Sequence, residues 1–368
     1  MKIKTLGLAA TVIMGCGMAQ AAPSYSLIDL GEQDSANSFA ISINNSGQIV
    51  GGSRQVNDLN FIATYWSSST SKALGFSGGA SSALGINNSG QSVGFSNVAG
   101  KSNLHAVTWS SGSLVDLGTL GGDSSATGIN DAGLVVGYAF STGHVSSDAF
   151  VWEKGTKNFL PRLDGSFARA EGVNNLGQVV GSSSTYASVA AHATIWNGNA
   201  ITDLGGLGGA SSALAINDSG VVVGYSYTSD SSNTIHATVW NGTTSSDLGS
   251  LDSGNSFATS INSAGQIVGY TSTSGMHGGI NAALLWDGGT MYDLNELVTS
   301  GNLGMSLLTA QDINDSGQIV GVGMMSSGQT HAFLLTPVLG VPEPSILAML
   351  AVSLGALGVS KRKKFTTN

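Results

Sequence analysis

The stretch Ile313-Asn314-Asp315-Ser316-Gly317-Gln318-Ile319-Val320-Gly321 decides the fold, because close copies of it recur along nearly the whole chain. The copies begin at Ile43, Ile86, Ile129, Val173, Ile216, Ile261 and Ile313. Their second residue is always asparagine: Asn44, Asn87, Asn130, Asn174, Asn217, Asn262 and Asn314. Successive asparagines are 43, 43, 44, 43, 45 and 52 residues apart. A period of about 40 to 50 residues is typical of propellers, solenoids and repeat arrays.

The second repeat shows what one unit contains. Residues 81–86 alternate small and apolar side chains and predict a strand, 87–90 are turn residues, and 91–95 predict the returning strand. Residues 105–109 and 113–118 predict two further strands, and no repeat has a helical pattern. Four short antiparallel strands per repeat match a propeller blade, so the sequence predicts an all-β, seven-bladed β-propeller over residues 22–337.

The two ends of the repeat array complement each other. The last repeat stops at Pro337 after its third strand and lacks a fourth. A matching strand at 25–31 precedes the first repeat and is similar to 114–118 of the second. We therefore expect the N-terminal strand to complete the last blade and close the ring, which removes the open edges of the array.

Composition limits the partners of this ring. Charged residues make up only 10% of the 368 residues, and residues 23–340 carry 7 basic and 21 acidic side chains. An acidic surface repels phosphate backbones, so we expect no nucleic acid partner. Solubility is the preferred explanation of the acidity, with cation binding as the alternative. The single cysteine, Cys16, precedes the repeats, so the ring is predicted to have no disulfide.

The N-terminus has the three parts of a signal peptide. Lys2 and Lys4 are followed by an apolar segment at 6–18 and by the cleavage pattern Ala19-Gln20-Ala21. We predict a signal peptide over residues 1–21, with Ala22 as the first residue after cleavage by signal peptidase. A lipoprotein anchored at Cys16 is the alternative.

Residues 338–368 contain a second tripartite segment. Pro342-Glu343-Pro344 precedes an apolar span at 345–360 and the basic tail Lys361-Arg362-Lys363-Lys364. Basic residues after an apolar span hold that end on the cytoplasmic side, and the span is shorter than the roughly 20 residues of a stable transmembrane helix. We expect a transient inner-membrane anchor, with an ordinary C-terminal anchor as the alternative.

This order of parts resembles the PEP-CTERM sorting signal of Gram-negative bacteria. The resemblance implies recognition by an exosortase, removal of the tail near the PEP motif, and release to or retention at the cell surface. Proteins of this kind tend to occur in bacteria that make exopolysaccharide.

The repeats also resemble those of HAF-repeat extracellular proteins, over roughly residues 25–336. The matching pieces are His331-Ala332-Phe333 and Asp116-Leu117-Gly118-Thr119-Leu120-Gly121-Gly122, with a second copy of the latter at 203–209. The departures are Ile62, Asp148 and Asn281 at the histidine position and Ala73 at one aspartate position. The resemblance implies the architecture and export, but no particular activity.

Several side chains recur once per repeat and are candidate site residues. We expect the tryptophans to pack between blades and the histidines to hydrogen-bond neighbouring turns. The tryptophans are Trp66, Trp109, Trp152, Trp196, Trp240 and Trp286, and the histidines are His105, His192, His236 and His331. The aspartates Asp29, Asp116, Asp203, Asp247 and Asp293 are expected to cap turns. Positions repeated around a ring lie too far apart to share a metal, so no metal, cofactor or catalytic residue is predicted.

The segments that differ between repeats are candidates for binding. Most join the second and third strands, so we expect them on one face of the ring. They are 53–60, 140–148, 182–191, 227–234, 271–280 and 291–311, and they carry Tyr186, Tyr227 and His277. The longest step places its extra residues at 295–309. A carbohydrate- or protein-binding face would have this composition, as would ordinary surface loops.

We therefore predict an exported, non-catalytic surface or matrix protein that displays its loops to an exopolysaccharide or a surface protein. The alternative is a polysaccharide lyase or hydrolase with its site in the central funnel. That alternative requires acidic or histidine residues that break the repeat pattern. A purely structural envelope component is the third hypothesis.

Overall fold

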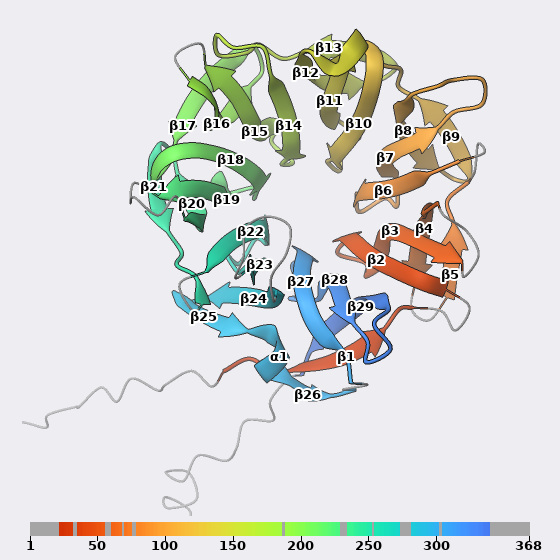
Figure 1. The fold of residues 1–368 in the computed structure, drawn as a ribbon, viewed down its shortest axis with the longest axis vertical. Helices are drawn as coiled ribbons and strands as arrows, with labels where there is room; N and C mark the ends of the chain where they lie inside the picture. Colours follow the sequence, from red (N-terminus) through yellow and green to blue (C-terminus); the bar gives the residue numbers. More distant parts are fainter. Residues whose placement is uncertain are drawn as a thin grey trace, which may run out of the picture.

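The chain forms a ring of seven β-sheets (Figure 1). The computed structural model describes residues 22–31, 35–55, 60–67, 70–75, 79–185, 188–228, 234–251, 254–272, 281–301 and 304–338. Six sheets have four strands and the seventh has five. The predicted seven-bladed β-propeller of four-stranded blades is therefore confirmed.

Each of the first six blades is one continuous segment whose strands run in order from the channel outward. Blade 1 is β2 (Ser35–Ile43), β3 (Gln48–Gln55), β4 (Ile62–Ser67) and β5 (Thr70–Ala73). Blade 2 is β6 (Ser81–Ile86), β7 (Ser92–Asn97), β8 (Leu104–Ser110) and β9 (Ser113–Asp116). Blade 3 is β10 (Gly121–Ile129), β11 (Val135–Ser141), β12 (Ser147–Glu153) and β13 (Thr156–Phe159), with a short 3₁₀ turn, η1 (Thr142–His144), between β11 and β12.

The next three blades repeat this order. Blade 4 is β14 (Ala168–Val173), β15 (Gln178–Thr185), β16 (Ser188–Asn197) and β17 (Ala200–Gly205). Blade 5 is β18 (Gly208–Ile216), β19 (Val221–Thr228), β20 (Ile235–Asn241) and β21 (Thr244–Asp247). Blade 6 is β22 (Asn255–Ile261), β23 (Ile267–Ser272), β24 (Asn281–Asp287) and β25 (Thr290–Asp293).

The nonapeptide forms the hairpin between the two inner strands of every blade. In blade 1, Asn44 donates its backbone N–H to the Gln48 carbonyl, and its Oδ1 accepts the Gln48 N–H at 2.9 Å. The first glycine of each copy has a positive φ, as at Gly47 (74°), which glycine adopts without a steric penalty. The last glycine is required for packing, because a Cβ at Gly94 would overlap the carbonyl oxygen of Ser82 on the inner strand.

The hydrophobic core lies between the blades. Each of the seven buried clusters draws on two consecutive blades, and together they run round the whole ring. Six of these clusters contain the tryptophan of the third strand, and in the cluster between blades 6 and 7 Leu335 takes that position. The tryptophans therefore lie between blades, five of them at most 5% exposed and Trp152 partly exposed.

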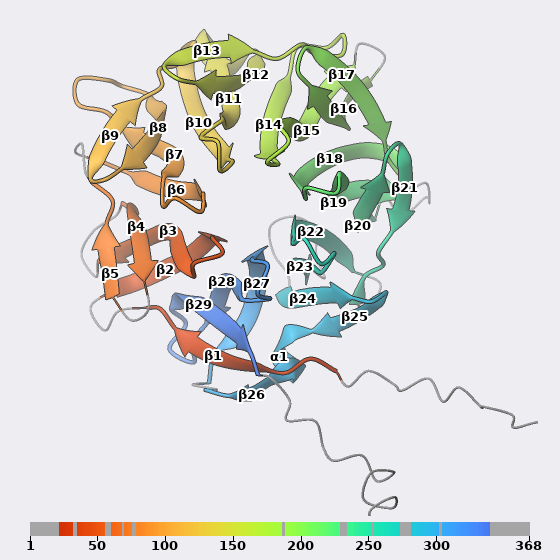
Figure 2. The same cartoon turned by 180° about the vertical axis from the view of Figure 1, so that it is seen from behind.

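Blade 7 is assembled from both ends of the ring. Its inner strands are β27 (Ser306–Ile313), β28 (Ile319–Met324) and β29 (Thr330–Pro337), and β1 (Tyr25–Asp29) is the fourth. Antiparallel pairing joins Tyr25 to Pro337 and Asp29 to Phe333. The predicted closure of the ring by the N-terminal strand is confirmed, and Figure 2 shows β1 beside β29 from the reverse side.

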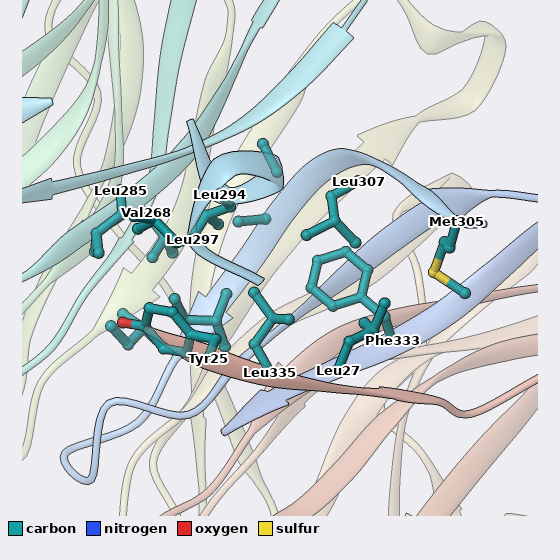
Figure 3. Packing of buried hydrophobic residues seen from close by; sticks show 14 residues of the cluster. Tyr25, Leu27, Val268, Leu285, Leu294, Leu297, Met305, Leu307, Phe333 and Leu335 are labelled. Carbon is teal, nitrogen blue, oxygen red and sulfur yellow. The ribbon is translucent and has the colours of Figure 1, made fainter. Parts of the chain in front are cut away.

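The extra residues of the longest repeat cover this closure. They form α1 (Leu294–Leu297) and β26 (Val298–Ser300), which pairs parallel to β1 as a fifth strand. Leu294, Leu297 and Leu307 are buried in one cluster with Tyr25 and Leu27 (Figure 3). The segment 291–311 was predicted as a candidate binding loop, but its apolar side chains are needed to seal the closing strand.

Candidate functional site

The repeated asparagines form a closed ring of hydrogen bonds at one mouth of the central channel. Each one donates its side-chain N–H to the backbone carbonyl of the asparagine in the next blade, over 2.9–3.2 Å, and Asn314 returns to Asn44. Each Oδ1 accepts the backbone N–H four residues later. All seven side chains are buried, so these bonds link the blades where water cannot compete.

The residues that follow these asparagines surround a cavity of about 230 Å³ at the same mouth. They are Asn45, Asn88, Asp131, Asn175, Asp218, Ser263 and Asp315. Most are tied to the next blade, as where Asn88 donates its backbone N–H to Asp131 at 2.9 Å. Burial acts to raise the pKa of Asp315, but hydrogen bonds from Ser263 and Asn45 outweigh it and lower that pKa. These carboxylates already have partners and serve the ring.

Deeper in the channel a cavity of about 360 Å³ is lined by the inner strands. Two positions contribute in every blade, with a third residue in four of them (Ile86, Ile129, Val173 and Ile216). A β-bulge lies at these positions in every inner strand. The pairs are Ile41 and Ser42, Leu84 and Gly85, Thr127 and Gly128, Glu171 and Gly172, Leu214 and Ala215, Thr259 and Ser260, and Gln311 and Asp312. Among these described residues, only Glu171 and Asp312 carry a charge.

Asp312 serves as a connector between blades 6, 7 and 1. Its carboxylate accepts hydrogen bonds from Ser260 Oγ at 2.6 Å, from Ser42 Oγ at 2.9 Å, and from the backbone N–H groups of Ile43 and Ile313 at 2.9 Å each. Burial raises the pKa of Asp312, and these four hydrogen bonds oppose the rise. All the acceptor capacity of the carboxylate is used within the ring, so a structural role accounts for Asp312 and no ligand is needed to explain it.

Glu171 has no such network. It is partly buried, and its carboxylate accepts no hydrogen bond from the described part of the chain. Burial raises its pKa to about 7, although the positive charge of Arg169 acts in the opposite direction. An unpaired carboxyl in a cavity with a strongly shifted pKa is a recognised mark of a functional site.

Arg169 lies two residues before Glu171 on β14 and is held by aromatic rings of blade 3. Its guanidinium carbon is 4.7 Å from the centroid of the Tyr138 ring and 5.1 Å from that of Phe140. Such cation–π contacts orient the guanidinium without using its N–H donors. No described residue accepts a hydrogen bond from this side chain or forms an ion pair with it.

The aromatic surface continues across blades 5 and 6. The rings of Tyr225 and Phe257 meet edge-on with their centroids 5.3 Å apart, and Phe257 stacks on Tyr270 with a centroid distance of 4.9 Å. Burial, with a smaller contribution from the charge of Glu171, raises the pKa of Tyr138 and of Tyr225. Glu171 is therefore near tyrosines of the blades on both sides of it.

The recurring histidines pair with the recurring aspartates. His105 Nδ1 lies 2.8 Å from Asp116, and the pairs His192–Asp203, His236–Asp247 and His331–Asp29 repeat this contact at 2.7–2.9 Å. The prediction of a neighbouring turn as the histidine's partner was wrong in detail, because the ring nitrogen contacts an aspartate carboxylate of the next strand. The two positions change together in blade 1, where Ile62 occurs with Ala73, but not in blade 6, which keeps Asp293 without a histidine, so this signal for the pairing is incomplete.

The same aspartates cap turns. The carboxylates of Asp29, Asp116, Asp203, Asp247 and Asp293 each accept the backbone N–H two residues later, at 2.7–2.8 Å. In blade 3 the histidine position holds Asp148, which binds Arg162 at 2.7 Å instead. The same His–Asp contact occurs in four blades, and each aspartate also caps a turn, so these contacts are best explained as structural links between the two outer strands.

Several predicted residues lie outside the described part of the chain. These are the signal peptide with Ala19 and Ala21, the sorting motif with its basic tail, Tyr186 and His277. Ala22 is exposed and Tyr227 is partly buried at the end of β19. Among the described residues, no helix is long and apolar enough to cross a membrane, and no group of three or more potential metal ligands occurs.

Comparisons with known proteins support the fold alone. No family model and no curated protein matches the chain. The β-propeller domain of the Trilobed protease from Pyrococcus furiosus, described as having an open velcro topology, is 10% identical with a TM-score of 0.55 over 87% of this chain and 100% of that one. A gluconolactonase from Xanthomonas campestris is 11% identical with a TM-score of 0.42 over 86% of this chain and 99% of that one. The first of these two shows that the chain is similar in architecture to a known β-propeller domain.

Proposed function

We propose that this protein is an exported, non-catalytic binding module of the cell surface or extracellular matrix, associated with exopolysaccharide. One observation supports the binding role: no described residue forms a hydrogen bond with the side chains of Arg169 and Glu171, which occur in blade 4 alone. The polar groups that recur in every blade at the channel, in contrast, form hydrogen bonds with one another. The surface location rests on the sequence of the two termini, which resemble a signal peptide and a PEP-CTERM sorting signal. Signal peptidase and an exosortase would process the chain during its passage through the inner membrane.

The sorting part is tested by the intact mass and location of the protein in its native host. We expect a mature chain that begins at Ala22, ends near Pro344, and occurs at the surface or in the medium. A chain that still extends to Asn368 in the inner membrane would make the tail an ordinary anchor and remove the argument for a matrix role.

One observation favours an enzyme as a second candidate. A carboxyl group with a pKa of about 7 can serve as a general acid, and Glu171 has that pKa in a cavity. Glycoside hydrolysis ordinarily uses two carboxylates, however, and the other one lining this cavity, Asp312, is occupied by four hydrogen bonds. Incubation with the host's polysaccharide decides the matter: new reducing ends or unsaturated products that disappear in Glu171→Gln would establish the enzyme.

A further inference from the structure

Blade 4 carries two side chains that the fold does not explain. At the position of Arg169 the other blades have Phe39, Ser82, Ser125, Ser212, Phe257 and Thr309, and at the position of Glu171 they have Ile41, Leu84, Thr127, Leu214, Thr259 and Gln311. These alternatives support the same strand, bulge and hairpin in every blade. The common strand therefore does not need Arg169 or Glu171, and no described residue forms a hydrogen bond with either side chain.

Their position in the channel follows from the direction of β14. The strand runs towards the asparagine ring, so Arg169 lies on the far side of Glu171 from that mouth. Glu171 lines the 360 Å³ cavity, and Arg169 lies two residues earlier on the strand, beside the rings of Tyr138 and Phe140. The cavity is within the usual size range of ligand sites, and its Glu171 carboxyl is close enough to Arg169 for the positive charge of the guanidinium to act on the pKa of Glu171.

We propose that this part of the channel binds a neutral sugar, held between Arg169 and Glu171. Sugar hydroxyls both donate and accept hydrogen bonds, and the two side chains offer free donors and a free acceptor side by side. Tyr138, Phe140 and Tyr225 supply apolar ring surface for the carbon-bound face of the sugar. Where Glu171 is ionised, above a pH of about 7, its charge and that of Arg169 cancel, which disfavours both a simple anion and a simple cation.

The proposal deepens the proposed function and rests on its binding role, but not on the sorting route. Asp312 is not a candidate sugar ligand, because its carboxylate already accepts four hydrogen bonds from residues of the ring. Arg169 is also oriented before any ligand arrives, since the two rings of blade 3 hold its guanidinium in place. Such preorganisation reduces the entropy lost on binding.

The repeats themselves supply the variants for the test. Arg169→Ser introduces the residue found at Ser82, Ser125 and Ser212, and Glu171→Leu introduces that of Leu84 and Leu214. Both should therefore fold, which circular dichroism and the thermal midpoint check. Lys72→Ser, on the exposed outer strand of blade 1, removes the same charge as Arg169→Ser and is the matched control.

The measurement is calorimetric titration of the full chain, in a detergent without a sugar headgroup. The probes are neutral gluco-, galacto- and manno-oligosaccharides and an oligouronate. We expect a neutral oligosaccharide to bind, and its affinity to fall at least tenfold in Arg169→Ser and in Glu171→Leu but less than twofold in Lys72→Ser. Glu171→Gln, which keeps the shape of the side chain, should also weaken binding. It replaces Glu171→Leu or Arg169→Ser in the test if either of these does not fold.

Three results would overturn the proposal. One is no binding of any neutral probe to the parent chain, and another is binding that survives both channel variants. The third is binding of the oligouronate alone, lost only in Arg169→Ser, which would make the site an anion site. None of these results bears on the mass or location of the mature protein, so failure here and failure of the sorting proposal are distinguishable.

Discussion

Blades 7 and 4 both depart from the common repeat, but in different ways. Blade 7 departs at its outer edge, where β1, α1 and β26 replace a fourth strand supplied in sequence. Every one of these additions is accounted for by buried apolar contacts. Blade 4 keeps the common assembly and departs in its inner strand, where no described residue hydrogen-bonds the side chain of Glu171 and Arg169 contacts only aromatic rings. A residue that deviates from the repeat therefore indicates function only when packing and hydrogen bonding within the fold do not explain it.

Deletion of residues 25–31 should have the largest effect on this comparison. Tyr25, Leu27 and Leu30 are at most 6% exposed, and burial of each such side chain stabilises by about 1.5–3 kcal/mol. We expect the free energy of unfolding to fall by more than about 5 kcal/mol, because the ladder to β29 and the cover of β26 are lost as well. Thermal and denaturant unfolding of the full chain measure it. An unchanged unfolding curve would refute closure by β1.

Leu294→Ala should have the next largest effect, since this side chain of α1 is fully buried against the closing strand. Truncation of a buried leucine costs about 2–5 kcal/mol. The control is Leu176→Ala in the hairpin of blade 4, whose side chain is 70% exposed and should change stability by less than about 0.5 kcal/mol. Equal losses in the two variants would mean that α1 does not seal blade 7.

Sequence reasoning succeeded where the signal was local and repeated. The Asn and Gly positions of the turns, the four strands per repeat and the missing fourth strand of the last repeat all follow from such signals. It did not find β26, because three residues, Val298 to Ser300, carry too little pattern, and their partner β1 lies more than 270 residues away. It also missed Glu171 and Asp312, because the prediction concentrated on the variable loops, and each of these carboxylates occurs in only one blade and so shows no period.

The shared asparagines should behave alike in both blades. Asn174→Ala and Asn314→Ala each remove one bond of the closed ring and leave a backbone N–H of their own hairpin, that of Gln178 or Gln318, without its side-chain acceptor. A buried group left unsatisfied costs about 1–3 kcal/mol. We expect losses in this range that agree within about 0.5 kcal/mol, measured by denaturant unfolding. A loss confined to Asn314→Ala would show that the hydrogen-bond ring matters only at the closure.

Glu171 should give the smallest effect, and one that depends on pH. Its pKa of about 7 in the folded chain lies above the value of about 4.3 expected when unfolded, so between these pH values the folded state binds the extra proton. The free energy of unfolding of the parent chain should therefore fall as pH rises from about 4.3 to 7, by about 1–2 kcal/mol for a group that is only partly buried. Glu171→Leu should remove this part of the pH dependence and be the more stable protein at pH 8.

The control Gln311→Leu, at the same position of blade 7, removes no carboxyl and should leave the pH profile of the parent unchanged. If Glu171→Leu and the parent lose stability in parallel over this interval, the carboxyl of blade 4 is not held in the neutral form by its surroundings, and the contrast between the two blades loses its electrostatic part.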